Sequence, residues 1–317
     1  MATRNKSNVI TLTRVYDAPL QSVWEAWTNP EEVAQWWGPR GFTITHHSRD
    51  LRTGGHWHYT MHGPDGTDYE NTTQYLEVVP QQRLIYDHGG HKDRPPLFRV
   101  TALFTERNGR TQLDMSMAFP TPEVAAEMSA FIKKAGGEGT WDRLAEYLGK
   151  RCSNKELFFI SRSFHADIDT LYDMWTDPAH LSAWLPPSGA TMRIIRAEPR
   201  VGGTSFYAMT FGNGETMYGR LNYLVLERPN RIAYTQQFCD EKENVMRPPF
   251  FAAWPETMCA FVEFAVEEPQ RTRVTVRWEP ADGATPADIA EFAQQRRSMT
   301  GGWTGSFEKL EALISRG

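Results

Sequence analysis

The 317-residue sequence has few cysteines and no excess of basic residues. Its three cysteines, Cys152, Cys239 and Cys259, are an odd number without close spacing, which argues against a disulfide framework or a zinc site. The net charge is −5, and neither half of the chain is basic, so the electrostatic footprint of a nucleic-acid-binding protein is missing. We therefore predict three unpaired thiols and no nucleic-acid partner.

Long apolar runs and catalytic signatures are also missing. No run approaches the roughly 18 apolar residues of a membrane-spanning helix, and residues 1–8 lack the apolar centre of a secretion signal. The sequence has no Gly-x-Ser-x-Gly, Walker or His-Glu-x-x-His pattern. We expect a cytoplasmic protein without a membrane span, predict no cofactor, and assign no catalytic residue.

Large aromatic side chains and methionines, in contrast, are abundant. The chain contains 11 Trp, 11 Tyr, 17 Phe and 12 Met residues. Aromatic side chains bury much surface, but the polar tips of Trp and Tyr need a partner or water. Two interpretations follow, namely a bulky core or an apolar cavity lined by aromatic and methionine side chains.

One stretch of the sequence occurs twice. Trp36 in the first copy matches Trp184 in the second, 148 positions later, and the residues around them match at the same spacing. A chain of 317 residues is long for a single core and suits two domains of about 150 residues. We predict two tandem domains, at residues 1–150 and 156–317, joined by a short polar linker.

Each copy has the same order of expected elements. In the first copy, alternating residues at 9–16 predict a strand, and Pro19 and Pro30 open two short helices. Several short strands follow, including a hairpin around Asn108-Gly109, and a long amphipathic helix ends the copy. Mostly antiparallel strands followed by a helix predict an α+β fold. A curved sheet wrapped round one long helix leaves space for a ligand between them.

The second copy contains an insertion between Gln237 and Thr257. The spacing between matching residues grows there from 148 to 161. The inserted stretch, near 238–257, includes Trp254 and several prolines and phenylalanines. This content is typical of a loop that closes over an apolar mouth. We predict a lid, and a contact between domains or between the subunits of a homodimer is the alternative.

Several short motifs resemble those of one known family. They are Asp17-Ala-Pro19 with Val23-Trp24, Trp27-Thr-Asn-Pro30, Trp36-Trp37-Gly38-Pro39, Asp50-Leu-Arg-Thr-Gly-Gly55, Pro64-Asp-Gly66, Arg83-Leu84 and the terminal Gly302-Trp303. On these motifs both halves resemble the START-like, helix-grip superfamily, also called SRPBCC. Within it they are similar to the group named after the activator of heat-shock-protein ATPase.

The resemblance implies tandem helix-grip domains. Each would be a curved antiparallel sheet wrapped round a long C-terminal helix, with two short helices after the first strand. Members of the superfamily include lipid and metabolite binders and cyclase-like enzymes, and the group's name comes from a co-chaperone. In the first copy the terminal Gly-Trp position aligns with Gly136-Gly137, so we expect that copy to lack this tryptophan.

Seven of the nine histidines lie in the first copy. His56, His58 and His62 share one face of a predicted strand, whereas Trp57, Tyr59 and Met61 share the other face. The apolar face is the better core face, so we expect the histidines to point outward. A proton donor in a cavity and a metal ligand are the alternatives. No cysteine or obvious carboxylate completes a ligand set, and we predict no metal.

The favoured function is binding of a hydrophobic or aromatic small molecule in a cavity between the sheet and the C-terminal helix. Alternatives are a cyclase- or hydrolase-like enzyme that uses the same cavity, and a co-chaperone that binds a partner and activates its ATPase. For Trp36 and Trp184, packing of the short helices competes with ligand contact. The predicted ligand-binding residues are Trp36, Trp57, Tyr59, Met61, Tyr86, Met128, Phe131, Tyr207, Met209, Tyr234, Trp254, Phe292, Met299 and Trp303.

Overall fold

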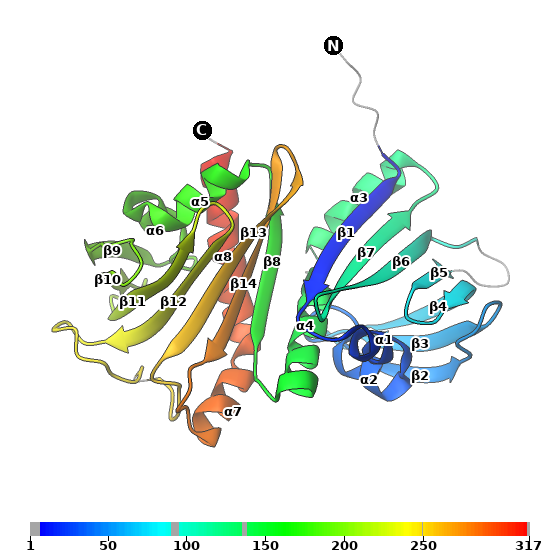
Figure 1. Cartoon of the computed structure of the whole chain (residues 1–317), viewed down its shortest axis with the longest axis horizontal. Coiled ribbons are helices and arrows are strands. Elements are labelled where there is room, and N and C mark those ends of the chain that lie inside the picture. The colour runs from blue at the N-terminus through cyan, green and yellow to red at the C-terminus, as the bar shows by residue number, and fades with distance from the viewer. Residues whose placement is uncertain (1–6, 90–94, 135–137, 249, 316–317) are drawn as a thin grey trace, which may run out of the picture. The chain divides into compact units, whose positions relative to one another are not determined.

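The computed structural model describes residues 7–89, 95–134, 138–248 and 250–315. The chain divides into two compact units, Met1–Asn154 and Lys155–Gly317, called here the first and second domains. Within the described ranges each domain contains one seven-stranded antiparallel sheet and four helices (Figure 1). This architecture confirms the predicted α+β class with tandem helix-grip domains.

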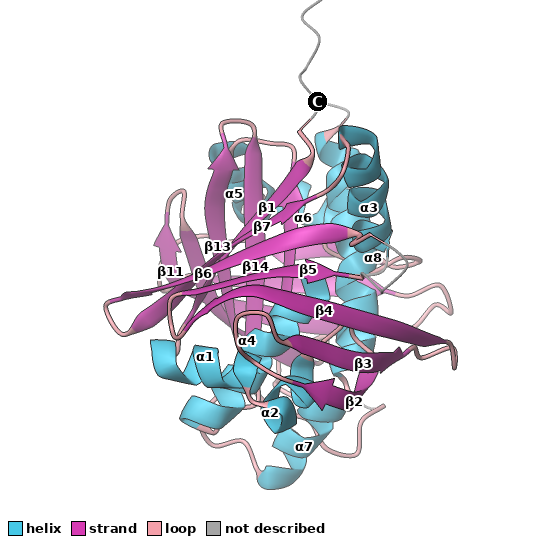
Figure 2. Ribbon diagram, turned by 90° about the vertical axis from the view of Figure 1, so that its right-hand side faces the viewer, coloured by secondary structure: helices cyan, strands magenta, loops and turns pink. Residues whose placement is uncertain are grey.

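The first domain has its strands in the order β1-β7-β6-β5-β4-β3-β2 (Figure 2). Every neighbouring pair is antiparallel. The predicted long terminal helix is described as two helices, α3 and α4, and residues 135–137 between them lie outside the described ranges. The elements are β1 (Val9–Tyr16), α1 (Leu20–Thr28), α2 (Pro30–Trp36), β2 (Thr43–Arg49), β3 (His56–His62), β4 (Asp68–Val79), β5 (Arg83–His88), β6 (Phe98–Arg107), β7 (Arg110–Ala118), α3 (Pro122–Lys134) and α4 (Glu138–Ser153).

The second domain repeats this topology, with the strand order β8-β14-β13-β12-β11-β10-β9. Its terminal helix α8 lies against one face of the sheet (Figure 1). The elements are β8 (Phe158–Phe164), α5 (Ile168–Thr176), α6 (Pro178–Trp184), β9 (Thr191–Arg196), β10 (Thr204–Thr210), β11 (Thr216–Glu227), β12 (Arg231–Cys239), β13 (Met258–Glu268), β14 (Arg271–Pro280), α7 (Pro286–Gln294) and α8 (Arg296–Ile314).

The second short helix of each domain begins in the same way. The Asn29 side chain accepts a hydrogen bond from the backbone N–H of Glu31 at 2.9 Å, and Asp177 accepts one from Ala179 at 2.7 Å. Proline occupies the first helical position in both copies, where its missing N–H costs nothing. The shared Asn/Asp-Pro sequence therefore fixes where the chain turns from α1 into α2 and from α5 into α6.

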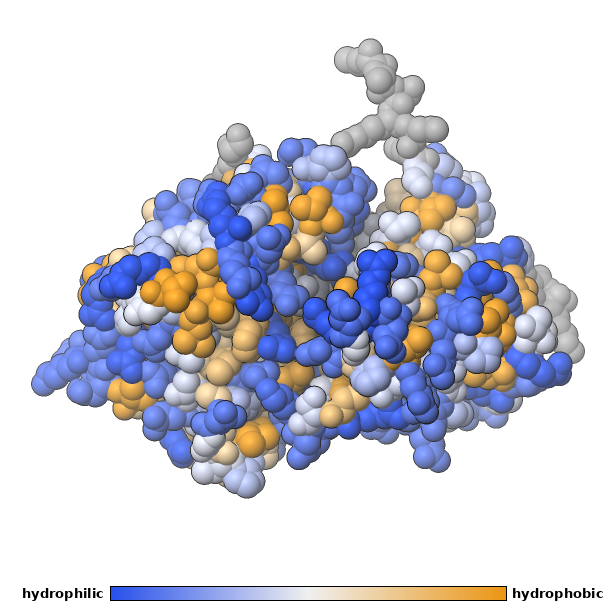
Figure 3. Space-filling view, in the orientation of Figure 1, coloured by the Kyte–Doolittle hydropathy of each residue, from blue (hydrophilic) through white to orange (hydrophobic). Residues whose placement is uncertain are grey.

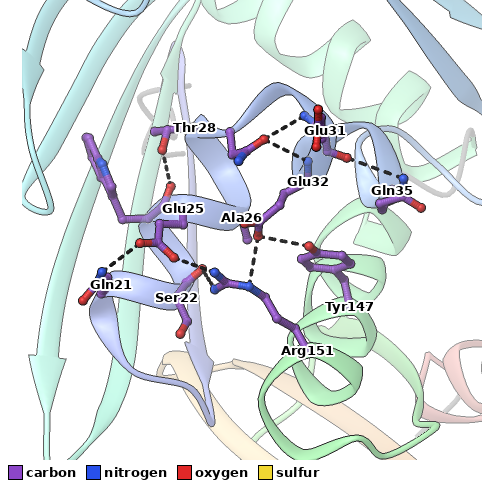
Figure 4. A network of polar contacts seen from close by, with 12 residues as sticks. Gln21, Ser22, Glu25, Ala26, Thr28, Glu31, Glu32, Gln35, Tyr147 and Arg151 are labelled. Carbon is purple, nitrogen blue, oxygen red and sulfur yellow. Dashed lines mark hydrogen bonds and ion pairs between the residues drawn. The ribbon is translucent and has the colours of Figure 1, made fainter.

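A polar network holds α4 against the two short helices of the first domain (Figure 4). Arg151 donates to the carbonyl oxygen of Ser22 at 3.0 Å and to the Glu25 carboxylate at 2.5 Å. It also forms a 3.2 Å ion pair with Glu32, which accepts a hydrogen bond from the Tyr147 hydroxyl at 3.0 Å. These contacts fix α4 against α1 and α2.

Buried apolar side chains form one core cluster in each domain. On the face shown in Figure 3, apolar side chains appear at several places and are interrupted by polar ones. Scattered apolar side chains are normal on a protein surface. None of the described helices has both the length and the apolar composition needed to cross a membrane.

Candidate functional site

A cavity of about 230 Å³ lies in the second domain between the sheet and α8. Aromatic rings, methionines and leucines supply most of its wall. Its lining residues are Leu185, Pro187, Tyr207, Met209, Phe211, Met217, Tyr218, Leu221, Tyr234, Gln236, Phe238, Trp278, Met299, Gly302, Trp303 and Ser306. An apolar hollow with a few polar groups is the usual form of a small-molecule site.

Strand pairing brings the sheet side of this wall together. Met209 on β10 pairs with Met217 on β11, and Leu221 on β11 pairs with Gln236 on β12. Paired residues of neighbouring strands point to the same face of a sheet. Every second side chain of β10, β11 and β12 therefore points toward the cavity.

Helix α8 supplies the opposite side. Met299, Gly302, Trp303 and Ser306 line the cavity, and their spacing of three, one and three places them on one helical face. The Ser306 hydroxyl donates to the carbonyl oxygen of Leu185 at 2.6 Å. This bond ties α8 to the residue that follows α6.

Few polar atoms face the cavity. The Gln236 amide donates to the Tyr207 hydroxyl at 3.0 Å. Burial raises the pKa of Tyr207 and of Tyr234 above the usual value, and the Gln236 hydrogen bond offsets only part of this effect at Tyr207. Both phenols therefore stay protonated at neutral pH. The buried indole N–H of Trp278 lies beside the Tyr234 hydroxyl, and this contact offsets part of the burial effect on the pKa of Tyr234.

A glycine makes room for the Tyr207 ring. Gly219 pairs with Tyr207 across the β10–β11 ladder, and a Cβ added at Gly219 would lie 2.3 Å from the Tyr207 hydroxyl oxygen. Tyr207 therefore leans over the neighbouring strand, where it meets Gln236, because position 219 carries no side chain.

A second hollow of about 250 Å³ adjoins the cavity, with Met217, Tyr218 and Phe238 lining both. The inserted stretch borders this outer hollow through Met246 and Pro248. The insertion thus lies beside the cavity region, as a lid would. Whether it opens and closes stays a prediction.

The centre of the insertion packs into the core. Trp254 is 4% exposed, stacks on Phe251 at 4.7 Å and lies 6.1 Å from Phe292 of α7. Neither Trp254 nor Phe292 is among the described residues that line the 230 Å³ cavity. Both were predicted to contact ligand, and the structure places them together in the buried core.

Asp288 fastens the insertion to the start of α7. Its carboxylate accepts hydrogen bonds from the Trp254 backbone N–H at 3.1 Å and from the Thr285 hydroxyl at 2.7 Å, and it pairs with Arg247 at 3.3 Å. Burial would raise the pKa of Asp288, but the Thr285 hydrogen bonds, together with Arg247 and Trp254, hold it below its usual value. The carboxylate is therefore charged at neutral pH, although it is only 2% exposed.

The interior of the first domain carries larger side chains at the corresponding place. Trp37 follows α2 as Leu185 follows α6. The Trp37 ring lies 5.3 Å from that of Trp57, and its N–H donates to the Tyr59 hydroxyl at 3.1 Å. Trp57 in turn stacks on Tyr59 at 4.0 Å. Predicted ligand residues Trp57 and Tyr59 thus form part of a packed aromatic cluster.

The expectation that the first copy lacks the terminal tryptophan is wrong. Gly136 and Gly137, with which the Gly-Trp position was aligned, lie outside the described residues. Trp141 of α4 lies 6.3 Å from Trp36, and Trp303 of α8 lies 6.4 Å from Trp184. Trp141 therefore takes the role of Trp303.

Trp36 and Trp184 join the two short helices of their domains. Both are fully buried, and their indole N–H groups donate to the carbonyl oxygens of Ala26 at 2.9 Å and Met174 at 2.8 Å. This geometry is the one that the packing interpretation describes, and ligand contact by Trp36 stays a prediction.

The remaining predicted residues of the first domain are spread over the sheet and α3. Tyr86 is buried, and the centre of its ring lies 6.2 Å from that of Tyr75. Met61 is half-buried and packs against the core. Met128 is half-buried on α3, and the side chain of Phe131 is outside the described residues. In the second domain Tyr207, Met209, Tyr234, Met299 and Trp303 all line the cavity.

Of the three histidines of β3, His56 and His58 are exposed, as predicted, and His62 is half-buried. Trp57 and Tyr59 of the same strand are buried. No group of three or more His, Cys, Asp or Glu side chains in the described ranges is placed to hold a metal ion.

His88 is a different case, because burial lowers its pKa to about 4. His88 on β5 pairs with Thr73, and Gln236 on β12 pairs with Leu221. His88 and Gln236 therefore hold equivalent positions on the inner faces of their two sheets. His88 is neutral at neutral pH.

A comparison with models of protein families matches most of the sequence to one family. The sequence model described as Activator of Hsp90 ATPase homolog 1-like protein matches residues 17–149 and 165–315. The chain belongs to this family. Both copies are members, as the resemblance implied. A search of curated proteins gives no match.

Several solved structures are similar to part or nearly all of this chain. A protein from Mycobacterium smegmatis is 19% identical, with a TM-score of 0.43 over 51% of this chain and 91% of that one. A protein from Nitrosomonas europaea is 25% identical, with a TM-score of 0.42 over 45% and 95%. The di-domain ARO/CYC protein BexL from the BE-7585A biosynthetic pathway is 15% identical, with a TM-score of 0.39 over 96% and 97%.

In this member of the family, sequence reasoning missed several cavity residues, among them Leu185, Gln236 and Gly302. Leu185 could have been found from its mismatch with Trp37, since it replaces an indole by a smaller side chain. Gly302 could have been found from its helical spacing to Met299 and Ser306.

Proposed function

We propose that the second domain binds a small, largely apolar molecule that contains one or two rings. The observation that carries this proposal is the cavity of about 230 Å³ between the sheet and α8. A cavity of about 150 Å³ can hold benzene, and drug-sized ligands occupy roughly 300–1,000 Å³. The ligand should therefore be larger than benzene and smaller than a typical drug.

The lining supports a molecule with flat apolar surfaces and a polar substituent. Tyr207, Tyr234 and Trp303 offer ring faces and edges, which favour stacked or edge-on contact with an aromatic ligand. Gln236 lines the cavity and gives one amide N–H to Tyr207, so its second N–H could bind a hydroxyl or carbonyl oxygen on the ligand.

Binding is better supported than acid–base catalysis. Acid–base catalysis needs a group whose pKa lies near the working pH. Within the described lining there is no carboxylate, imidazole, thiol or amine. Burial raises the pKa of Tyr207 and Tyr234, so these phenols stay neutral: they can donate a hydrogen bond but are weak acids, and they are poor bases at neutral pH. A cyclase-like reaction in this cavity would have to depend on such donors alone.

Two measurements test the proposal. Native mass spectrometry of the full chain purified from its own host should show a retained small molecule. Titration with the fluorescent two-ring alcohol 2-naphthol should show saturable binding to the wild type, and Leu185→Trp, which fills the cavity, should abolish it. Binding that is unchanged in Leu185→Trp, or no binding by either method, would refute the proposed site.

A further inference from the structure

Gly302 interrupts the row of side chains that α8 presents to the cavity. Met299 lies three positions before it and Ser306 four positions after it, and all three line the cavity. Glycine is the least favourable residue in a helix interior after proline, because it loses the most backbone freedom. A glycine at this place therefore calls for a reason in packing or in binding.

Packing gives no reason at Gly302. Apart from its chain neighbours and the backbone of its own helix, a Cβ added there would have no atom within 4 Å. Gly305 differs, because its added Cβ would lie 2.7 Å from the Ser188 hydroxyl oxygen. Gly301, next to Gly302, also has open space around an added Cβ, but it is exposed and does not belong to the described cavity lining.

The first domain carries a side chain at the same helical position. The matching contacts of Trp141 with Trp36 and of Trp303 with Trp184 align Thr140 with Gly302. They also align Gly139 with Gly301. Thr140 is buried, in the domain where the indole of Trp37 packs among other aromatic rings. Glycine at the position of Gly302 thus occurs only in the copy with the described cavity, whereas glycine at the position of Gly301 occurs in both copies.

We propose that Gly302 sets the size of the ligand that the second domain accepts. A two-ring molecule would lie with one face against the bare helix backbone at Gly302, which a side chain would otherwise cover. This inference rests on the proposed function. It names a specificity-determining residue: an alanine methyl group at position 302 would extend into the cavity, so that a two-ring ligand no longer fits while a one-ring ligand still does.

The test compares Gly302→Ala with Gly301→Ala in the full chain. Both changes replace a helical glycine by alanine, so both should raise the melting temperature of the second domain by about 2–4 °C. Fluorescence titration with 2-naphthol should show an affinity loss of roughly tenfold or more in Gly302→Ala, as expected for one methyl group in an apolar pocket. Gly301→Ala should bind 2-naphthol like the wild type.

Phenol serves as the one-ring probe and should bind all three proteins equally well in calorimetry. Equal 2-naphthol affinity in Gly302→Ala and Gly301→Ala would overturn the role of Gly302 while leaving the proposed function intact. An equal loss of both probes in Gly302→Ala would also overturn it, because the effect would not depend on ligand size. If the wild type binds neither probe, the proposed function fails and the inference fails with it.

Discussion

Trp37 and Leu185 occupy equivalent positions directly after the second short helix of each domain, and the cavity lies beside the smaller of the two side chains. In the first domain the Trp37 indole donates to Tyr59. In the second domain the equivalent hydroxyl, that of Tyr207, accepts a hydrogen bond from Gln236 instead. The larger side chain thus belongs to a packed aromatic cluster, and the smaller one borders the cavity.

Exchanging these residues should exchange the properties of the two interiors. Trp37→Leu removes the hydrogen-bond donor to Tyr59 and leaves space in a packed cluster. We expect the first domain to lose stability, by less than the roughly 3–5 kcal/mol of a buried Trp→Ala change. Chemical denaturation measures this loss. Gain of 2-naphthol binding by Trp37→Leu in the Leu185→Trp background would show that the space is accessible, and unchanged stability would contradict the packed cluster.

His88 should make the first domain sensitive to mild acid. Its pKa is lowered by burial from 6.5 to about 4, so between these pH values the unfolded chain binds a proton that the folded chain refuses. Stability should therefore be full above pH 6.5 and fall as the pH drops toward 4, by at most roughly 3 kcal/mol.

His88→Gln supplies the residue found at the equivalent position of the second domain. Denaturation curves recorded from pH 7 to pH 4.5 should lose most of this slope in His88→Gln. The matched control is His58→Gln, which changes an exposed histidine and should keep the slope. A slope that persists in His88→Gln would show that another group titrates.

Gly219→Ala should destabilise the second domain although it adds only one methyl group. The added Cβ would lie 2.3 Å from the Tyr207 hydroxyl oxygen, so the ring must move and its hydrogen bond with Gln236 must break. We expect a loss of about 1–3 kcal/mol in chemical denaturation. In the Tyr207→Leu background the same change should cost much less, and equal costs in both backgrounds would place the clash elsewhere.

Asp288→Asn should loosen the insertion at neutral pH. The change removes the charge that faces Arg247. It also replaces one acceptor oxygen by an NH₂ donor, which cannot accept the hydrogen bonds of the Trp254 and Thr285 N–H groups. The expected cost is about 1–3 kcal/mol, with faster hydrogen exchange in residues 250–256. Asp282→Asn changes an exposed carboxylate in the preceding loop and should have no effect on exchange. Equal exchange in both variants would mean that Asp288 does not hold the insertion.

Much of the fold follows from local patterns. The alternation at Val9–Tyr16 and His56–His62 predicts β1 and β3 with the bounds that they have, because period-2 burial is a property of the strand itself. The Asn29-Pro30 pair predicts the start of α2 for the same reason. Repetition of these patterns, together with the family motifs, predicts the tandem architecture.

The site was less accessible from sequence, because it depends on how distant side chains fill one volume. Tyr207, Met209 and Met299 were selected as inward-facing apolar residues, and they line the cavity. Trp254 was selected as part of the predicted lid but packs against Phe251, since an inserted loop has no period that tells where a side chain points. Gly302 gave no signal as an apolar residue, because its contribution is the absence of a side chain.

The Asp288 carboxylate binds both the insertion and the first turn of α7, so the two segments depend on the same buried charge. Thr285 and Asp288 cap α7, and the same carboxylate receives Trp254 and Arg247 from the insertion. A chain engineered to the shorter loop length of the first copy would keep a buried negative charge but lose two of its partners. Shortening the loop should therefore also require an apolar or smaller residue at position 288, and the two changes have to be made together.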